Sequence, residues 1–173
     1  MIGLEKFTPS DRDTWTWSLA SFEDIADIVN MAETLFQVEI EDFLRPDPAL
    51  LTRNLAISVS KQAYSLYDEQ LIVARNKTTN KLMAWAWVGR GAYTPYSRDE
   101  MAEGKFAHMD LDLPVRTRIT LLAQILHQWY AWASVCRIPV LVSTSIREEQ
   151  AGFMNLHRAA GFTIRGSIGY LKV

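Results

Sequence analysis

The last quarter of the chain switches repeatedly between strand-like and helix-like patterns, and this restricts the fold more than any other feature. An apolar run over Pro139–Thr144 predicts a short buried strand. Ser145 and Glu148 predict the capping box that begins a helix. Gly161 predicts the end of that helix, because glycine adopts a positive φ without penalty. The remaining residues predict a closing strand, and strands that alternate with helices are typical of an α/β chain.

The upstream sequence supplies the other elements of a mixed sheet flanked by helices. Alternating residues predict strands, and three- and four-residue spacing predicts helices. The order β-α-α-β-β-β-α-β-α-β predicts one α/β (α+β) domain over residues 1–173, in which residues 1–12 form an extended arm. The expected strands are 14–19, 71–76, 82–88 and 106–113, the expected helices begin after Ser21 and at Pro48 and span 116–134, and residues 89–104 are expected to form a loop.

The apolar spacing also predicts which side chains are buried. The helix over 116–134 is expected to bury Ile119, Leu122, Leu126, Trp129 and Ala133, and to carry Thr120, Gln124 and His127 on a more polar stripe. Large rings alternate with small side chains over 82–88, which indicates two packed layers. Trp85, Trp87 and Trp129 are expected in the core, whereas Trp15, Trp17 and Trp132 either pack inside or line a groove for a partner.

The composition excludes several functional classes. The chain has 173 residues, of which 49% are hydrophobic and 22% charged, and this suffices for one domain with its own core. A net charge of −2 does not favour nucleic acid as a partner. The sequence shows neither an apolar run of about 18 residues nor a signal-peptide pattern, so no membrane association and a cytoplasmic location are expected. Cys136, the single cysteine, cannot form an internal disulfide, and no spacing typical of a metal site occurs.

The last predicted helix ends in a recognisable run of residues. Leu-His-Arg-Ala-Ala-Gly-Phe, residues 156–162, resembles the Leu-Tyr-x-Lys-x-Gly-Phe close of the GNAT superfamily of acyl-coenzyme A-dependent N-acetyltransferases. The element order is also similar to the GNAT fold from end to end. The resemblance implies a three-layer GNAT-like fold with about six strands and four helices. It also implies acetyl-CoA as co-substrate, no metal, and a cleft where the strand before the long helix splays from its neighbour.

In this family the pyrophosphate lies on backbone N–H groups at the start of the long helix, a general anion site. A count back from Cys136 places Arg116 first in the signature Arg/Gln-x-x-Gly-x-Gly/Ala, with Ile119 and Leu121 at the glycine positions. A register that begins at Arg118 matches only at its ends. The two arginines either pair with phosphates or are solvated. The cofactor-binding residues that the resemblance implies are Leu113, Val115, Arg116, Thr117, Arg118, Thr120 and Leu121.

The resemblance also implies catalytic roles for two aspartates. Asp110 and Asp112 share one face of the predicted strand over 106–113 with His108. An acid on this strand commonly removes the proton of the acceptor ammonium in the family, directly or through water. The alternative is a polar strand face that lies under the loop at 89–104.

His157 stands at the position of the family's tyrosine, which often protonates the leaving thiolate. Histidine can serve as a general acid near neutral pH, and the alternative is a partly buried residue that packs beside Phe153. Ser143 and Ser145 end the preceding strand, near where acceptors dock in the family.

The leading expectation is an N-acetyltransferase that acts on a primary amine of a small molecule or a protein. Acidic Glu39, Glu41 and Asp42 favour a cationic acceptor. The alternative is a catalytically degenerate GNAT-like domain, a protein-interaction or structural module that binds a protein partner, such as a phage-encoded virion component. A third expectation is an enzyme of this fold that uses a different acyl donor.

Overall fold

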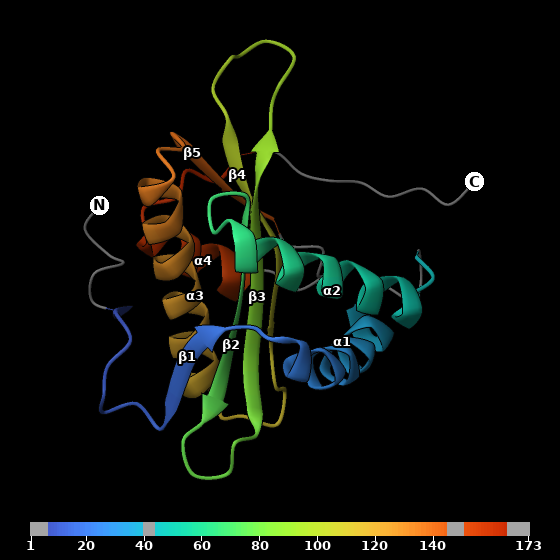
Figure 1. Cartoon of the computed structure of the whole chain (residues 1–173). Coiled ribbons are helices and arrows are strands. Elements are labelled where there is room, and N and C mark those ends of the chain that lie inside the picture. The colour runs from blue at the N-terminus through green and yellow to red at the C-terminus, as the bar shows by residue number, and fades with distance from the viewer. Residues whose placement is uncertain (1–6, 40–43, 145–150, 166–173) are drawn as a thin grey trace.

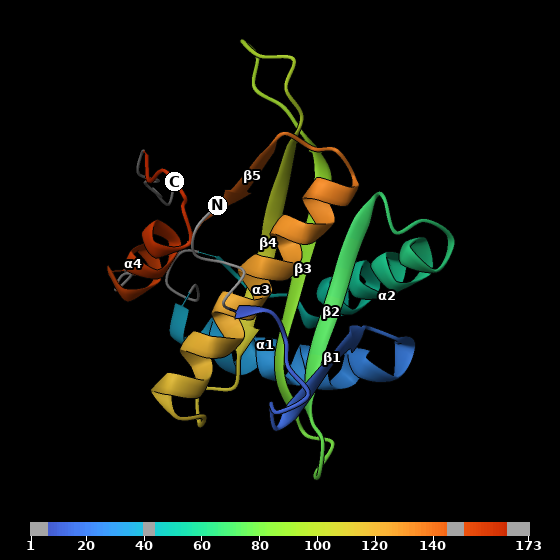
Figure 2. The same cartoon turned by 90° about the vertical axis from the view of Figure 1, so that its left-hand side faces the viewer.

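The computed structural model describes residues 7–39, 44–144 and 151–165. Helices cover both faces of a mixed sheet, α1 and α2 on one face and α3 and α4 on the other (Figure 1; Figure 2). The elements run in the order β1 (Trp15–Leu19), η2 (Phe22–Asp24), α1 (Ile25–Glu39), α2 (Pro48–Tyr64), β2 (Glu69–Asn76), β3 (Leu82–Ala92), β4 (Met101–Met109), α3 (Val115–Val135), β5 (Val140–Ser143) and α4 (Ala151–Ala159).

The helix ends follow the capping rules closely. Ser21 and Asp24 form a capping box, in which Glu23 N donates to Ser21 Oγ at 3.2 Å and Ser21 N donates to Asp24 Oδ2 at 2.8 Å. Asp47 caps α2 by accepting from Leu50 N at 2.9 Å. These predicted helix starts are therefore confirmed, whereas Ser145 and Glu148 lie outside the described residues.

Gly161 ends α4 as predicted. Its φ is +93°, its N–H donates to the carbonyl of Arg158 at 3.0 Å, and Phe162 N donates to the carbonyl of His157 at 2.9 Å. This double hydrogen bond is the Schellman motif. The same motif ends α3, where Arg137 occupies the left-handed position with φ +57°. An arginine there is strained, because its Cβ crowds the carbonyl oxygen in this region.

The sheet order follows the chain order, β1-β2-β3-β4-β5. The first four strands pair antiparallel, and β4 pairs parallel with β5 through the crossover helix α3. The mixed α+β architecture is as predicted. The predicted sixth strand falls largely on residues 166–173, which lie outside the described residues.

β4 begins and ends earlier than the strand predicted over 106–113. β3 continues to Ala92 and β4 begins at Met101, so the expected loop over 89–104 is wrong at both of its ends. β4 stops at Met109, and the next residues turn, because Asp112 N donates to the side chain of Asp110 at 3.0 Å. Such a local aspartate hydrogen bond favours a turn over a strand.

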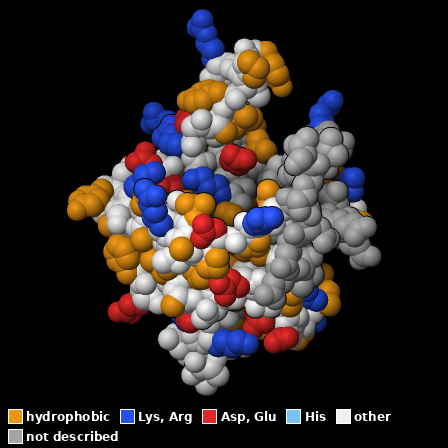
Figure 3. Space-filling view, turned by 90° about the vertical axis from the view of Figure 1, so that its right-hand side faces the viewer, with side chains coloured by type: hydrophobic (Ala, Val, Ile, Leu, Met, Phe, Trp, Pro, Cys, Tyr) orange, Lys and Arg blue, Asp and Glu red, His pale blue; other side chains and the backbone are white. Residues whose placement is uncertain are grey.

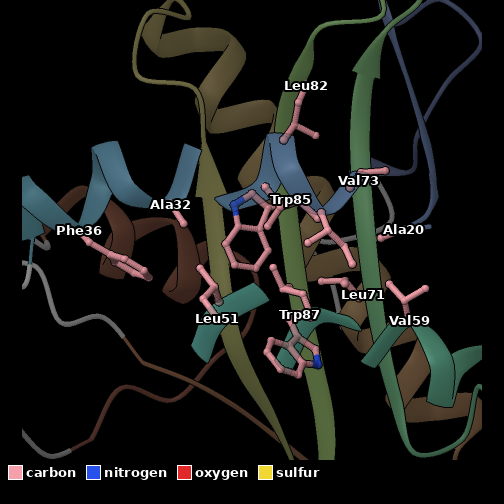
Figure 4. Close-up of a cluster of buried hydrophobic side chains, with 13 residues drawn as sticks. Ala20, Ala32, Phe36, Leu51, Val59, Leu71, Val73, Leu82, Trp85 and Trp87 are labelled. Carbon is pink, nitrogen blue, oxygen red and sulfur yellow. The ribbon is translucent and has the colours of Figure 1, made fainter. Parts of the chain in front are cut away.

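Large and small side chains of β3 separate onto the two faces of the sheet, as predicted. Trp85 and Trp87 pack under α1 and α2 together with Leu71 and Val73 (Figure 4). Ala84 and Ala86, on the other face, lie under α3. Small residues there let the long helix approach the sheet closely.

Gln124 joins α3 to the first strand and helps to decide between the two expected placements of the tryptophans. Its side-chain oxygen accepts from Trp15 Nε1 at 2.8 Å and from Trp17 Nε1 at 2.7 Å. Its amide nitrogen donates to Asp13 at 2.8 Å. Trp15 is buried, Trp17 is half-buried, and Trp132 is buried with its indole donating to the carbonyl of Leu66. The indoles thus turn inward because buried acceptors meet their N–H groups.

Candidate functional site

A cleft opens where β4 and β5 separate. The pair of Gly104 and Ser143 is the last rung of their ladder, whereas β4 continues to Met109. A cavity of about 550 Å³ lies beyond that rung, between β4, the start of α3, and α4. Figure 2 shows β5 flanking only part of β4 while α4 lies to the side. Among the described residues, no strand therefore pairs with the second half of β4 on this side.

The exposed edge of β4 presents backbone groups to this cleft. Asp110 N donates to the carbonyl of Met83 on β3 at 2.9 Å, and His108 stands opposite Trp85 in the same register. Backbone groups of successive strand residues point to opposite sides, so the N–H and C=O groups of Ala107 and Met109 point away from β3 and toward the cleft.

Gly104 lies at the apex of the cleft because a tryptophan fills the space beside it. An ideal Cβ on Gly104 would lie 2.3 Å from Cζ3 of Trp129 on α3. Trp129 is 2% exposed and, like Gly104, lines the cleft. Only glycine allows this approach of ring to strand. The sequence-based prediction missed Gly104 because it placed this residue in a loop.

The first turn of α3 forms the other end of the cleft. Pro114 is the N-cap residue and no side chain caps the helix, whose first turn carries no acidic residue. The first helical hydrogen bond from this end is donated by Arg118 N to the carbonyl of Pro114 at 3.1 Å. The N–H groups of residues 115–117 therefore precede it, at the positive end of the helix dipole.

The residues predicted to bind the cofactor do not all reach the cleft. Val115 and Arg118 line it. Ile119 lines it as well and is 50% exposed, so the prediction that Ile119 lies in the core is wrong. Arg116 is exposed, and Thr117, Thr120 and Leu113 are half-buried. Leu121 is fully buried against the sheet, so its side chain faces the core.

Asp110 and Asp112 do not lie on a strand, and the prediction of one shared strand face with His108 is wrong. They follow β4 in a turn and line a second cavity of about 390 Å³ between α1 and the start of β3. Asp110 forms an ion pair with Lys81 at 2.6 Å. Met109 and Leu111 line both cavities, so the two are neighbours.

His108 does line the main cleft, on the side of the sheet that α1 covers. It is buried among aromatic rings, with centroid distances of 5.6 Å to Phe36, 5.0 Å to Trp85 and 5.5 Å to Phe106. Phe36 and Phe106 line the cleft as well. An imidazole thus stands in an apolar wall, where a proton acceptor is only weakly solvated.

His157 is fully buried behind the opposite wall. Its side chain is enclosed by Phe153 at 4.0 Å and Phe162 at 4.9 Å between ring centroids. Nδ1 lies 2.8 Å from the carbonyl oxygen of Phe153, and Nε2 lies 2.9 Å from Oγ of Ser143. Burial lowers the pKa of His157 below its ordinary value, and the hydrogen bond to Phe153 opposes this effect only in part.

Ser143 connects this buried histidine to the cleft. It lines the cavity at the end of β5, whereas His157 reaches the cavity only through it. The sequence signal for Ser143 was its place at a strand end, and no local pattern indicated the contact with His157.

The described surface carries charged side chains of both signs. Lysine, arginine and acidic side chains are interspersed over the described part of the face in Figure 3. Within residues 7–39, 44–144 and 151–165, no group of three histidines, cysteines or acids could hold a metal ion. No helix in the same ranges is both long and apolar enough to cross a membrane.

No protein-family model matches the sequence, and no curated protein matches it significantly. Solved structures match the fold instead. A protein from Bacillus halodurans has a TM-score of 0.71 at 10% identity, covering 91% of this chain and 99% of that chain. A predicted acetyltransferase with acetyl-CoA from Clostridium acetobutylicum has a TM-score of 0.67 at 12% identity, covering 91% and 96%. Glucosamine-6-phosphate N-acetyltransferase from Arabidopsis thaliana has a TM-score of 0.63 at 12% identity, covering 93% and 99%.

Identities this low show a shared fold but do not show a shared activity, which must be argued from the site. The chain has the fold of acetyltransferases, the GNAT fold.

Proposed function

We propose that this protein transfers an acetyl group from acetyl-CoA to a primary amine. One observation carries the proposal: the β4–β5 ladder ends at Gly104 and Ser143 while β4 continues, so the edge of β4 faces a cavity large enough for a cofactor arm. The structural similarity to a predicted acetyltransferase with acetyl-CoA supports it.

The extended arm of the donor would pair with β4 as a strand does. The backbone groups of Ala107 and Met109 point to the cleft, where they offer hydrogen bonds to the amides of the arm. A backbone N–H in this row would also stabilise the oxyanion that forms when the thioester carbonyl is attacked. Because these donors belong to a sheet, they are already oriented before the reaction.

The pyrophosphate would lie at the first turn of α3. The uncapped N–H groups there favour an anion, and Arg118 lines the cleft beside them. Arg116 is exposed and lies two residues before Arg118 in the same helix, and it would supply a second cation. These side chains replace the glycine-lined approach that is typical of the family.

The acceptor would enter from the side of α1, where Phe36, Phe106 and His108 line the cleft. We assign removal of the ammonium proton to His108, because His108 lines the main cavity whereas Asp110 lines the neighbouring one. Asp110 and Asp112 keep a proposed secondary role, in which water of the neighbouring cavity passes the proton on. An amine acceptor agrees with the name of the glucosamine-6-phosphate N-acetyltransferase of the same fold.

Calorimetric titration tests this assignment and separates its parts. We expect the protein to bind acetyl-CoA at micromolar concentration and to bind acetyl-pantetheine, which lacks the pyrophosphate, more weakly. Arg118→Ala should weaken acetyl-CoA binding about tenfold and leave acetyl-pantetheine binding unchanged. Arg53→Ala, which removes an exposed arginine from α2, is the matched control. Absence of binding at millimolar acetyl-CoA contradicts the proposed function.

That negative result would favour the alternative, a non-catalytic module of the same fold. Trp15 and Trp132 do not line a surface groove for such a partner, because both side chains are buried. A protein partner, a phage origin and a place in a virion stay predictions.

A further inference from the structure

We propose that Ser143 is a nucleophile that takes the acyl group from the thioester before the amine receives it. This inference rests on the proposed function, since it assumes that an acyl thioester occupies the cleft. It rests on the contact between the cleft-lining Ser143 and the buried His157. A serine, a base and a group that orients the base are the three parts of an activated nucleophile.

The direction of the hydrogen bonds follows from their chemistry. The carbonyl oxygen of Phe153 can only accept, so Nδ1 of His157 carries the proton and donates across 2.8 Å. In the neutral ring Nε2 is then an acceptor. Oγ of Ser143, at 2.9 Å, therefore donates its proton to Nε2.

The surroundings hold the ring in this state. The rings of Phe153 and Phe162 enclose the imidazole, and His157 is 1% exposed. Charged imidazolium is poorly solvated there, so the neutral form is favoured. With its single N–H committed to a backbone carbonyl, neutral His157 acts on Ser143 as a proton acceptor rather than as a proton donor.

The first half-reaction forms a serine ester and releases CoA. Oγ of Ser143 attacks the thioester carbonyl carbon, and its proton moves to Nε2 of His157. The Oγ–C bond forms, the C–S bond breaks, and the leaving thiolate takes the proton from Nε2. Free CoA and a serine ester remain, and a backbone N–H of β4 such as that of Ala107 stabilises the oxyanion.

In the second half-reaction the nitrogen of a neutral amine attacks the ester carbonyl carbon. The N–C bond forms, the C–Oγ bond breaks, and the amine proton passes through Nε2 of His157 to Oγ of Ser143. The amide leaves and the serine hydroxyl is restored. No oxidant, reductant or metal enters either step.

Isotope exchange tests the covalent step without any acceptor. The full chain is incubated with acetyl-CoA and labelled CoA in the absence of amine. A serine ester returns its acetyl group to labelled CoA, so we expect label to appear in acetyl-CoA. An acid quench and peptide mass analysis should find one acetyl group on Ser143.

Variants separate the nucleophile from its base. Ser143→Ala should abolish exchange, and His157→Gln should slow it at least about 100-fold while the dissociation constant for acetyl-CoA stays the same. A purely structural role of His157 would change affinity together with rate. Ser134→Ala removes an exposed hydroxyl that bonds only the carbonyl of Tyr130, and it is the matched control. Thermal unfolding shows whether each variant is folded, and Ser143→Thr keeps a hydroxyl if the alanine variant is not.

The outcomes distinguish this inference from the function on which it rests. Exchange that depends on Ser143 supports the inference. Amide formation without exchange, or exchange that persists in Ser143→Ala, overturns the inference and leaves acetyl transfer in place. Absence of acetyl-CoA binding overturns both.

Discussion

Gly104→Ala should destabilise the protein because a tryptophan occupies the space beside Gly104. The added Cβ would lie 2.3 Å from Cζ3, 2.6 Å from Cη2 and 3.0 Å from Cε3 of Trp129. Carbon atoms in contact prefer about 3.5–4.0 Å, so the ring must retreat by about 1 Å or more. Trp129 is 2% exposed and packs with Ile125 and Ala102, so a retreat of its ring disturbs these contacts.

The expected loss follows from overpacking in a core of native density. Forced insertion of one methyl group typically destabilises by about 1–3 kcal/mol, and the rigid neighbour favours the upper half of that range. Urea denaturation followed by fluorescence measures the change in the free energy of unfolding. Gly152→Ala is the matched control, since Gly152 is an exposed residue of α4 and its added Cβ would meet nothing within 4 Å beyond its chain neighbours and the backbone of its own helix. The control should gain about 0.5–1 kcal/mol, because alanine favours a helix over glycine.

A double-mutant cycle identifies the cause. In the background of Trp129→Leu the added methyl group has room, so Gly104→Ala should become nearly neutral there. The reasoning is refuted by a loss below about 0.5 kcal/mol in the parent protein, or by an equal loss in both backgrounds. Because Gly104 and Trp129 both line the cleft, the single variant should also weaken acetyl-CoA binding.

Three further changes test other parts of the structure. Arg137→Gly should stabilise the protein by about 1 kcal/mol, because φ is +57° at this exposed residue; a lower melting temperature would contradict the strain assigned there. Gln124→Met should destabilise by about 2–4 kcal/mol in urea denaturation, because the indole N–H groups of Trp15 and Trp17 lose their acceptor; a loss no larger than about 0.5 kcal/mol would show that water replaces it. His157→Gln should flatten the pH dependence of stability. Burial lowers the pKa of His157 in the folded protein, so the unfolded chain binds its proton first, and the free energy of unfolding of the parent protein should fall as the pH drops below 6.5 toward the folded pKa. An unchanged slope between the parent protein and this variant, from denaturation at several pH values, would exclude the assignment.

Local signals in the sequence predicted the helix boundaries well. Ser21, Asp47 and Gly161 act through hydrogen bonds to residues within one helical turn, so their patterns are visible along the chain. The left-handed residue after α3 was missed, because arginine is not the residue that this conformation favours.

Period-two alternation was the weaker signal. The run Phe-Ala-His-Met-Asp-Leu-Asp-Leu, residues 106–113, alternates throughout, yet β4 ends in its middle. Asp110 bonds the backbone of Asp112 and thereby turns the chain, which hydrophobic alternation alone does not reveal. The predicted strand placed both aspartates at the main cleft, whereas in the structure they line the neighbouring cavity.

The contacts that define the candidate site join distant parts of the chain. Gln124 accepts from tryptophans more than a hundred residues earlier, and the pair of Ser143 and His157 joins β5 to α4. The need for glycine at position 104 arises from the ring of Trp129 on α3. Such contacts depend on the packing of whole elements, so residue spacing does not show them.

The most direct test of the central claim is amide hydrogen exchange at Ala107 and Met109, measured by NMR with and without acetyl-CoA. We predict that both amides exchange faster than that of their neighbour His108 in the free protein, because His108 pairs with β3. Acetyl-CoA should slow exchange at both positions and shift the resonances of residues 115–118. Binding that leaves Ala107 and Met109 unprotected, or that protects only the cavity beside Asp110 and Asp112, would contradict the assignment of the β4 edge as the donor site.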